Sequence, residues 1–339
     1  MAMLALWHWH IEISSKCTLR CPRCTRQEVP EGLVNKELRL PFFRKNFTPE
    51  FINEHVEKIT FCGDDGDPIY AHDLVPVIAY LKSVKPEVQI VIVTNGSYKR
   101  PDWWEKLGAV LDFRDHVHFS VDGWDQESND QYRVNSDWDS IVSGIQHLRK
   151  SSDCYMTWAA IAFSFNQDQL HVMKDMAHNL GMDQFQLTKS TKFGSIYPSY
   201  GSNDELEPAA ELVSSTLRFE RDITNLSGRV CPDDKQKAAA LFKAAEKQPG
   251  DIVPLCDVGN KGLYLNSRGQ LFPCCWVANR YKHNDEWNTR AQSFDLNKNS
   301  LTDVLRDPFW EGELRSFRWM ECKTKCSRAV VDLEYASNW

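Results

Sequence analysis

The sequence predicts an α/β protein in which a parallel sheet is followed by a small C-terminal α+β region. From residue 58 to residue 187, short apolar segments alternate with segments of helical character, and such units specify a parallel sheet with right-handed crossovers. After residue 250, a hairpin signal and a second set of cysteines indicate a separate small unit. The length of 339 residues is sufficient for about two domains.

The first part of the chain contains a regular series of expected strands and helices. Residues 7–13 alternate in the period-2 manner of a strand, and Thr48 followed by Pro49 has the pattern of a helix start. Residues 25–47 are charged and are expected to be irregular. The expected strands are 7–13, 58–62, 89–93, 116–119, 155–163 and 184–187, and the expected helices are 48–56, 72–84, 101–111, 137–150 and 168–180.

The chain changes character after residue 200. Residues 200–250 are polar and have few strand signals, so we expect a helical segment that bridges the mouth of the sheet. Strands over 262–265 and 270–272 flank the turn Asn266-Ser-Arg-Gly269, and a helix is expected at about 307–317. The expected domains are 1–199, 200–250 and 251–339.

Composition and charge are those of a soluble globular protein without a general attraction to nucleic acid or membranes. Apolar residues make up 42% of the chain and charged residues 26%, and 40 basic and 47 acidic residues give a net charge of −7. Residues 1–7 lack the basic start and cleavage site of a signal peptide, and no apolar run is long enough to span a bilayer. The 11 cysteines are therefore expected to be metal ligands and reduced thiols, and the protein to be cytoplasmic.

Three cysteines lie on one short loop directly after the first expected strand. Cys17, Cys21 and Cys24 form a C-x3-C-x2-C run. Thiolates with this spacing can hold three corners of a cubane iron–sulfur cluster and leave the fourth iron open to a small molecule. A structural zinc site would usually show a second C-x2-C or C-x2-H pair that completes four ligands, and no such pair lies nearby. The three cysteines could also be core thiols on one face of a helix, but Pro22 argues against a helix interior here.

Three further polar loops follow expected strands, and each by itself is compatible with a simple turn. They are Gly63-Asp-Asp-Gly66-Asp67-Pro68, Thr94-Asn95-Gly96 and Ser120-Val-Asp122-Gly123. Because the carboxyl ends of parallel strands meet at one edge, these loops and the cysteine loop together predict a ligand site there. His8 and His10 share a face of the first strand and are interpreted as polar positions of a half-buried strand.

A second set of cysteines lies in the C-terminal region. Cys256, Cys274, Cys322 and Cys326 would close a four-thiolate shell, which suits either an iron–sulfur cluster or a zinc ion. Cys275 competes with Cys274, although a strand edge should direct only one of two neighbours inward. Cys231 is interpreted as a free thiol.

These motifs resemble the radical S-adenosylmethionine (SAM) superfamily, specifically enzymes with a C-terminal SPASM or twitch domain. The resemblance covers nearly the whole chain and implies a partial (βα)6 barrel followed by a small cluster-binding domain. It implies that Cys17, Cys21 and Cys24 hold a [4Fe–4S] cluster whose open iron is chelated by the amino and carboxylate groups of SAM. The residues that correspond to SAM contacts in the family are Gly63, Asp64, Gly66, Asp67, Pro68, Thr94, Asn95, Ser120, Asp122 and Arg133.

Two positions in the first part depart from the family pattern. Residues 63–68 look like the glycine-rich G-x-x-G-E-P segment, whose backbone receives the methionine amino group, but Asp67 stands where Glu is usual. Arg23 precedes the third cysteine, where an aromatic residue is common and stacks near the adenine. Arg133, in the segment Asn129-Asp-Gln-Tyr-Arg133, is a candidate partner for the SAM carboxylate.

The C-terminal region follows the SPASM pattern only in part. The opening C-x(9–15)-G-x4-C is matched by Cys256, Gly269 and Cys274, but the later cysteine run is reduced to Cys322-x3-Cys326. These ligands suffice for one auxiliary [4Fe–4S] cluster, as in a twitch domain.

The resemblance also implies a chemistry and its partners. Reductive cleavage of SAM would yield a 5′-deoxyadenosyl radical that abstracts a hydrogen from the substrate, with electrons from an external flavodoxin- or ferredoxin-like donor. The auxiliary cluster would assist electron transfer.

Modification of a peptide or protein side chain is the leading interpretation, because SPASM and twitch domains most often imply it. The alternatives are modification of a nucleoside, nucleotide or nucleic-acid base, and, more remotely, a non-enzymatic iron–sulfur or zinc protein. No catalytic acid or base is identified.

Overall fold

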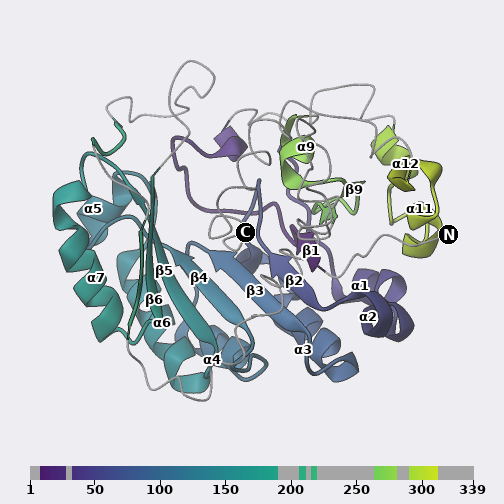
Figure 1. Ribbon diagram of the computed structural model, residues 1–339, viewed down its shortest axis with the longest axis horizontal. Helices are drawn as coiled ribbons and strands as arrows, with labels where there is room; N and C mark the ends of the chain where they lie inside the picture. Colours follow the sequence, from purple (N-terminus) through teal and green to yellow (C-terminus); the bar gives the residue numbers. More distant parts are fainter. Residues whose placement is uncertain are drawn as a thin grey trace, which may run out of the picture.

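The computed structural model describes residues 8–27, 33–189, 206–210, 215–219, 263–280 and 290–311. A sheet of nine strands lies at its centre (Figure 1). The first six strands lie side by side in chain order and run parallel, which confirms the predicted parallel sheet. They are β1 (His8–Ile11), β2 (Lys58–Phe61), β3 (Gln89–Thr94), β4 (His116–Ser120), β5 (Tyr155–Ala162) and β6 (Gln184–Lys189). The order is linear and its two ends do not pair within the described residues, so the sheet is open, as in a partial barrel.

The expected helices are present, with ends shifted by a few residues. Thr48 caps α2 by accepting a hydrogen bond from the amide of Phe51, and Pro49 is its first residue. The helices that connect the parallel strands are α2 (Pro49–His55), α3 (Leu74–Val84), α4 (Pro101–Gly108), α6 (Trp138–Ser151) and α7 (Leu170–Asn179). Short 3-10 segments lie at η1 (Thr25–Gln27), η3 (Pro68–Tyr70) and η4 (Gln167–Gln169).

In the part of the chain before residue 190, two helices lie where no helix was expected. Residues 40–46 form α1 (Leu40–Asn46), so the prediction of an irregular 25–47 segment is wrong for its last part. Pro41 occupies the first turn, where a missing amide costs nothing, and Phe43 is fully buried. Burial of this aromatic side chain therefore outweighs the charged character of the segment. The second is the short helix α5 (Gln126–Asp130).

The two faces of the sheet differ in polarity. Ile59, Ile92, Phe119 and Trp158 are fully buried and belong to the same apolar core as the inner sides of the helices. Helices α3, α4 and α6 lie along this side of the sheet (Figure 1). Because side chains alternate along a strand, the neighbouring positions face the other, concave side.

One edge of the sheet is formed by a strand within a region that was expected to be helical. Residues 215–218 form β7 (Ser215–Arg218), which pairs antiparallel with β6. All its residues are exposed, so a polar sequence here reflects an edge strand instead of a helix. The helical prediction for 200–250 is thus wrong for β7, and most of this region lies outside the described residues.

The other edge is formed by the predicted C-terminal hairpin. Strands β8 (Tyr264–Leu265) and β9 (Leu271–Phe272) pair antiparallel, and Gly269 adopts φ +85° in the turn between them. Strand β8 also pairs parallel with β1, so the hairpin extends the main sheet. The domain boundaries at 199 and 250 stay a prediction, since the residues around both lie outside the described ranges.

Three short helices complete the described C-terminal region: α9 (Cys275–Arg280), α11 (Leu301–Leu305) and α12 (Pro308–Glu311). The helix expected at 307–317 is confirmed as far as residue 311, beyond which the chain is outside the described residues. None of the described helices combines the length and apolar character needed to cross a bilayer.

Candidate cofactor site

The three cysteines lie on the loop between β1 and η1, in apolar surroundings. Cys21 is buried, while Cys17 and Cys24 are partly exposed. The apolar side chains packed around them are Leu19, Tyr132, Phe163 and Leu206. Burial raises the pKa of both Cys17 and Cys21 to about 12, and the Arg133 guanidinium offsets part of this rise at Cys21. Metal binding at this loop must therefore release protons from the thiols.

Hydrogen bonds from distant segments give the cysteine loop its shape. The carbonyl of Thr18 accepts from the Asn135 side chain at 2.8 Å, and the amide of Arg20 donates to the carbonyl of Val134 at 2.9 Å. The Thr18 hydroxyl lies 2.7 Å from the hydroxyl of Tyr70, which in turn donates to the carbonyl of Ser97. The cysteine loop is thus attached to the loops that follow β2, β3 and β4.

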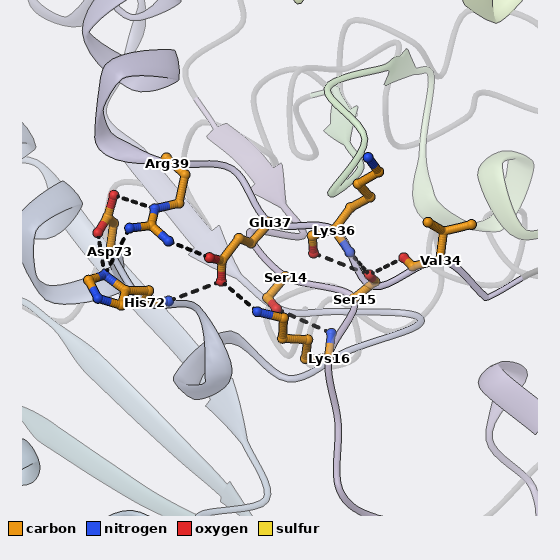
Figure 2. A network of polar contacts seen from close by, with 9 residues as sticks. All are labelled: Ser14, Ser15, Lys16, Val34, Lys36, Glu37, Arg39, His72 and Asp73. Carbon is orange, nitrogen blue, oxygen red and sulfur yellow. Dashed lines mark hydrogen bonds and ion pairs between the residues drawn. The ribbon is translucent and has the colours of Figure 1, made fainter.

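A network of ion pairs supports the entry into this loop (Figure 2). Glu37 accepts from Lys16 at 3.3 Å, from Arg39 at 2.6 Å and from the amide of His72 at 3.2 Å. Arg39 also donates to Asp73 at 2.8 Å. Burial opposes ionisation of Glu37, but hydrogen bonds from these partners outweigh it and lower its pKa. Lys16, which directly precedes Cys17, is thereby tied to the residues before α3.

Residues 14–16, which lead into the cysteine loop, also form hydrogen bonds with residues 34–37. The hydroxyl of Ser15 donates to the carbonyls of Val34 and Lys36 and accepts from the amide of Lys36 at 2.8 Å (Figure 2). Ser14 forms an antiparallel bridge with Glu37. Residues 14–16 are therefore held by a neighbouring stretch of chain before the first cysteine begins.

The glycine-rich loop after β2 packs directly against the cysteine loop. A Cβ atom at Gly66 would overlap the carbonyl oxygen of Ser14, and one at Gly63 would overlap that of Gly66. Arg26 donates to the carbonyls of both Ser15 and Asp65. Close backbone approach thus requires glycine at both positions, and the two loops form one unit.

Asp67 organises the loop that follows β3. Its carboxylate accepts from the Thr94 hydroxyl at 2.8 Å, and from the amide and the side chain of Asn95 at 2.6 Å each. Burial raises the pKa of Asp67 to about 6, although these hydrogen bonds act in the opposite direction. The side-chain nitrogen of Asn95 also lies 3.7 Å from the sulfur of Cys17. Asp67 therefore places an amide donor beside the first cysteine.

Asp122 and Arg133 form an ion pair beside the second cysteine. The Nε of Arg133 donates to Asp122 at 2.6 Å, and Asp122 also accepts from the amide of Ile161 at 2.6 Å. Burial lowers the pKa of Arg133, but the charges of Asp122 and Cys21 outweigh this effect and raise it above its ordinary value. The arginine proposed as a partner for the SAM carboxylate is thus positioned by a carboxylate of the chain itself.

Asn129 shapes the turn that follows β4. Its side-chain oxygen accepts from the amides of Asp122 and Gly123 at 3.0 and 3.2 Å. Ser120 lies partly exposed at the end of β4. The structure therefore brings every loop expected from the first part of the sequence to one edge of the sheet.

The second cysteine set is only partly within the described residues. Cys274 directly precedes α9, and Cys275 is its first residue, so the expectation that a strand edge selects one of them does not apply. Cys256, Cys322, Cys326 and Cys231 lie outside the described residues. Among those that are described, no three His, Cys, Asp or Glu side chains converge on a single metal ion. The thiolates of a cubane cluster lie farther apart than the ligands of a single metal ion, because each thiolate binds a different iron.

Sequence patterns alone did not identify Glu12 and Cys62 as parts of this region. Glu12 is 2% exposed and follows β1 on the face shared by His8 and His10. Burial, followed by the charges of Asp64 and Cys275, raises the pKa of Cys62 well above its ordinary value. The strand alternation of residues 8–12 is the one signal that could have singled out a carboxylate directed inward.

The two histidines of β1 have hydrogen-bonding roles. His8 lies 2.9 Å from the hydroxyl of Thr60, and His10 lies 3.0 Å from the carbonyl of Cys62. Their interpretation as polar positions of a strand agrees with these partners.

Comparison with known proteins gives a family for the part of the chain that carries this site. Residues 11–161 match the family model described as the Radical SAM superfamily. Among curated proteins, molybdenum cofactor biosynthesis protein 1 of Drosophila melanogaster is 24% identical over 88% of this chain, and this chain spans only 48% of that protein. The GTP 3′,8-cyclase of Campylobacter jejuni is 23% identical over 78% of this chain and 79% of its own length. AlbA of Bacillus subtilis, a subtilosin biosynthesis protein, is 20% identical over 94% of this chain and 64% of its own.

Solved structures show the same fold. Streptococcus suis SuiB bound to the precursor peptide SuiA superposes with a TM-score of 0.58 at 14% identity, over 97% of this chain and 71% of SuiB. SuiB has also been solved with S-adenosylmethionine bound, and that structure matches with a TM-score of 0.56. Residues 11–161 of this chain therefore form a radical SAM domain, which implies an enzyme with a [4Fe–4S] cluster and S-adenosylmethionine as cofactors.

Proposed function

We propose that this enzyme uses SAM to modify a peptide or protein side chain by abstracting a hydrogen atom. The observation that carries the proposal is the contact between the cysteine loop and three loops suited to a bound cofactor, at one edge of an open sheet. A substrate on the concave side of the sheet would face this edge.

The residues present fit the cluster and SAM. Cys17, Cys21 and Cys24 supply three thiols, and the positive charge of Arg133 favours the thiolate form of Cys21. Gly63 and Gly66 let the glycine-rich loop pack closely on itself and on the cysteine loop. We assign the contacts with SAM to residues at this edge: Gly63, Asp64, Gly66, Asp67, Pro68, Thr94, Asn95, Ser120, Asp122 and Arg133.

When bound, the reduced cluster and SAM supply a 5′-deoxyadenosyl radical. The chain contributes orientation and exclusion of water. Asp67 directs Asn95 toward Cys17, and Asp122 holds Arg133 beside Cys21. Leu19, Tyr132 and Phe163 form an apolar wall around the cysteines, which keeps solvent from a reactive intermediate.

An auxiliary [4Fe–4S] cluster is the second part of the proposal. Cys274 lies within the described structure, and we assign Cys256, Cys322 and Cys326 as its further ligands. A cluster with four protein ligands has no open iron, so its contribution would be electron transfer. An external donor of the flavodoxin or ferredoxin type would provide the electrons.

The peptide assignment is supported by two of the similar proteins. SuiB has been crystallised with a precursor peptide, and AlbA is named for the biosynthesis of the bacteriocin subtilosin. Both matches extend over more than nine tenths of this chain.

A nucleotide is the second candidate substrate. The curated relatives named GTP 3′,8-cyclase support the same candidate.

Anaerobic reconstitution tests the cofactor assignment. We expect about eight irons per chain, from two cubane clusters, and release of 5′-deoxyadenosine on reduction with dithionite in the presence of SAM. The Cys21→Ala variant should lose this release, whereas Cys274→Ala should lose about half the iron. Undiminished release from Cys21→Ala would contradict the assignment.

A comparison of two probes separates the substrate classes. GTP and any short peptide encoded by a gene adjacent to that of the enzyme are each added to the reconstituted enzyme, and 5′-deoxyadenosine formation is measured. Stimulation by the peptide alone supports the leading proposal, and stimulation by GTP alone supports the alternative.

A further inference from the structure

Glu12 is a buried carboxylate between the glycine-rich loop and the C-terminal hairpin. It directly follows β1, and only 2% of its surface is exposed. Its Oε1 accepts hydrogen bonds from the amide of Asp65 at 2.6 Å and the amide of Gly66 at 3.2 Å. Both amides belong to the loop that we assign to SAM.

The second carboxylate oxygen of Glu12 contacts the opposite side. Oε2 accepts from the amide of Ser267 at 3.4 Å and from its hydroxyl at 3.2 Å. The backbone amide of Glu12 donates to the carbonyl of Leu265 at 2.8 Å. Ser267 lies in the hairpin turn between β8 and β9, 255 residues away in sequence.

These contacts limit the conformations that the 63–67 loop can adopt. The amide of Asp67 donates to the carbonyl of Lys16 at 2.9 Å, and Arg26 donates to the carbonyl of Asp65. Gly66 lies directly against the backbone of Ser14. Glu12 accepts hydrogen bonds from two successive amides of this loop, so its position determines where the remaining polar groups of the loop point.

A carboxylate suits this position better than any other side chain of its size. The donors around it include three amides and one hydroxyl, and an ionised carboxylate accepts at both oxygens. Glutamine would retain one accepting oxygen, but its NH2 group would face the amide of Ser267 as a second donor. Glutamine therefore keeps the shape of Glu12 and loses part of its hydrogen bonding.

We propose that Glu12 is a positioning residue that presents the 63–67 loop to SAM and, through Ser267, couples the geometry of that loop to the C-terminal hairpin. This inference rests on the proposed assignment of the loop to SAM. It predicts that substitutions at a turn of the C-terminal region alter SAM affinity without touching the cofactor.

The experiment compares Glu12→Gln, Glu12→Ala and Ser267→Ala with the wild-type holoenzyme, at matched iron content. SAM affinity is measured by isothermal titration calorimetry, and the exchange of the 63–67 amides by hydrogen–deuterium exchange without SAM. We expect Glu12→Gln to raise the Kd for SAM about tenfold and Ser267→Ala about threefold, since each loses hydrogen bonds to a charged group. Exchange over 63–67 should become faster in all variants.

Asp115→Asn is the matched control. Asp115 is also a fully buried carboxylate and accepts from the amides of Ile90 and Asp112, but it lies before β4, at the opposite end of the strands. It should lower the melting temperature without changing the Kd for SAM.

The outcomes are distinct. An unchanged Kd in folded, iron-matched Glu12→Gln, with only the melting temperature lowered, would overturn the positioning role. If Glu12→Ala does not fold, Glu12→Gln and Ser267→Ala still decide the question. If the wild-type enzyme itself does not bind SAM, the proposed function fails instead. In that case, unchanged exchange over 63–67 in the variants would separately contradict the role of Glu12.

Discussion

Close backbone contacts and single hydrogen bonds determine the geometry around the cysteine loop. Gly66 lies against Ser14 so closely that no side chain can be accommodated, and Asn95 connects Asp67 with Cys17. In both cases the residues in contact are far apart in the sequence. The site is therefore sensitive to changes of one or two atoms at positions that do not bind metal.

Gly66→Ala tests the contact between the two loops. The added Cβ would meet the backbone of Ser14 and Ser15, which cannot move aside as a flexible side chain would. We expect a loss of about 1–3 kcal/mol in the free energy of unfolding and a sharp fall in SAM affinity. Chemical denaturation and calorimetry measure the two effects.

Gly181→Ala is the control for this substitution. Gly181 has φ +75°, but the nearest atom to an added Cβ is 3.5 Å away. It should cost about 1 kcal/mol through backbone strain alone and leave SAM affinity unchanged. Equal effects of both variants on SAM affinity would contradict a specific role for the contact at Gly66.

Asn95→Ala tests the donor beside the first cysteine. Hydrogen bonds to the sulfur ligands of a cluster stabilise its reduced form, since they offset the added negative charge. Removal of the Asn95 side chain should therefore make the reduction potential of the N-terminal cluster more negative. Redox titration followed by electron paramagnetic resonance measures this shift, with Ser83→Ala as a surface control. An unchanged potential would show that Asn95 acts only through Asp67.

The residues that could be recognised from the sequence are those with a spacing signature. Cys17, Cys21 and Cys24 are identified by their intervals, and Gly63 and Gly66 by their place after a strand. Glu12 has no such signature, because its partners are 53 to 255 residues away. Tertiary contacts of this length are set by strand order, which the local sequence does not specify.

At the scale of elements, the alternation of strands and helices was predicted well where local patterns and burial agree. Strands β2 to β6 each have a buried face, and they coincide with short apolar runs in the sequence. The misassigned elements are those whose sequence character conflicts with their environment. Helix α1 is charged yet buries Phe43, and β7 is polar because it forms an exposed edge.

Thr48→Ala tests the helix start that the sequence identified. The Thr48 hydroxyl accepts from the amide of Phe51 at 3.3 Å, so its removal leaves a donor at the beginning of α2 without this partner. We expect a loss of about 1 kcal/mol in the free energy of unfolding, measured by chemical denaturation. SAM affinity should stay at the wild-type value, because α2 does not contribute to the edge of the sheet where the loops assigned to SAM meet. A stability equal to that of the wild type would contradict the capping role.

At the scale of the whole molecule, the C-terminal hairpin is part of the main sheet. Strand β8 pairs with β1, the strand that leads into the cysteine loop, and the pairing continues in the hydrogen bond from the amide of His10 to the carbonyl of Leu263. A small cysteine-rich unit could be expected from the sequence, but its attachment to β1 could not. Parallel pairing between segments about 250 residues apart leaves no local signal.

This arrangement predicts that the first part of the chain depends on the last. A chain that ends at residue 262 would lack β8, and the backbone of β1 would become an exposed edge beside the cysteine loop. It would also remove Ser267 and leave Glu12 buried with part of its hydrogen bonding lost. We expect the truncated chain to aggregate and to bind well under half of the four irons expected for the N-terminal cluster. Size-exclusion chromatography and iron analysis measure both properties. A monomeric truncated chain that still cleaves SAM would show that residues 1–262 fold independently, and that β8 only adds to a sheet already complete without it.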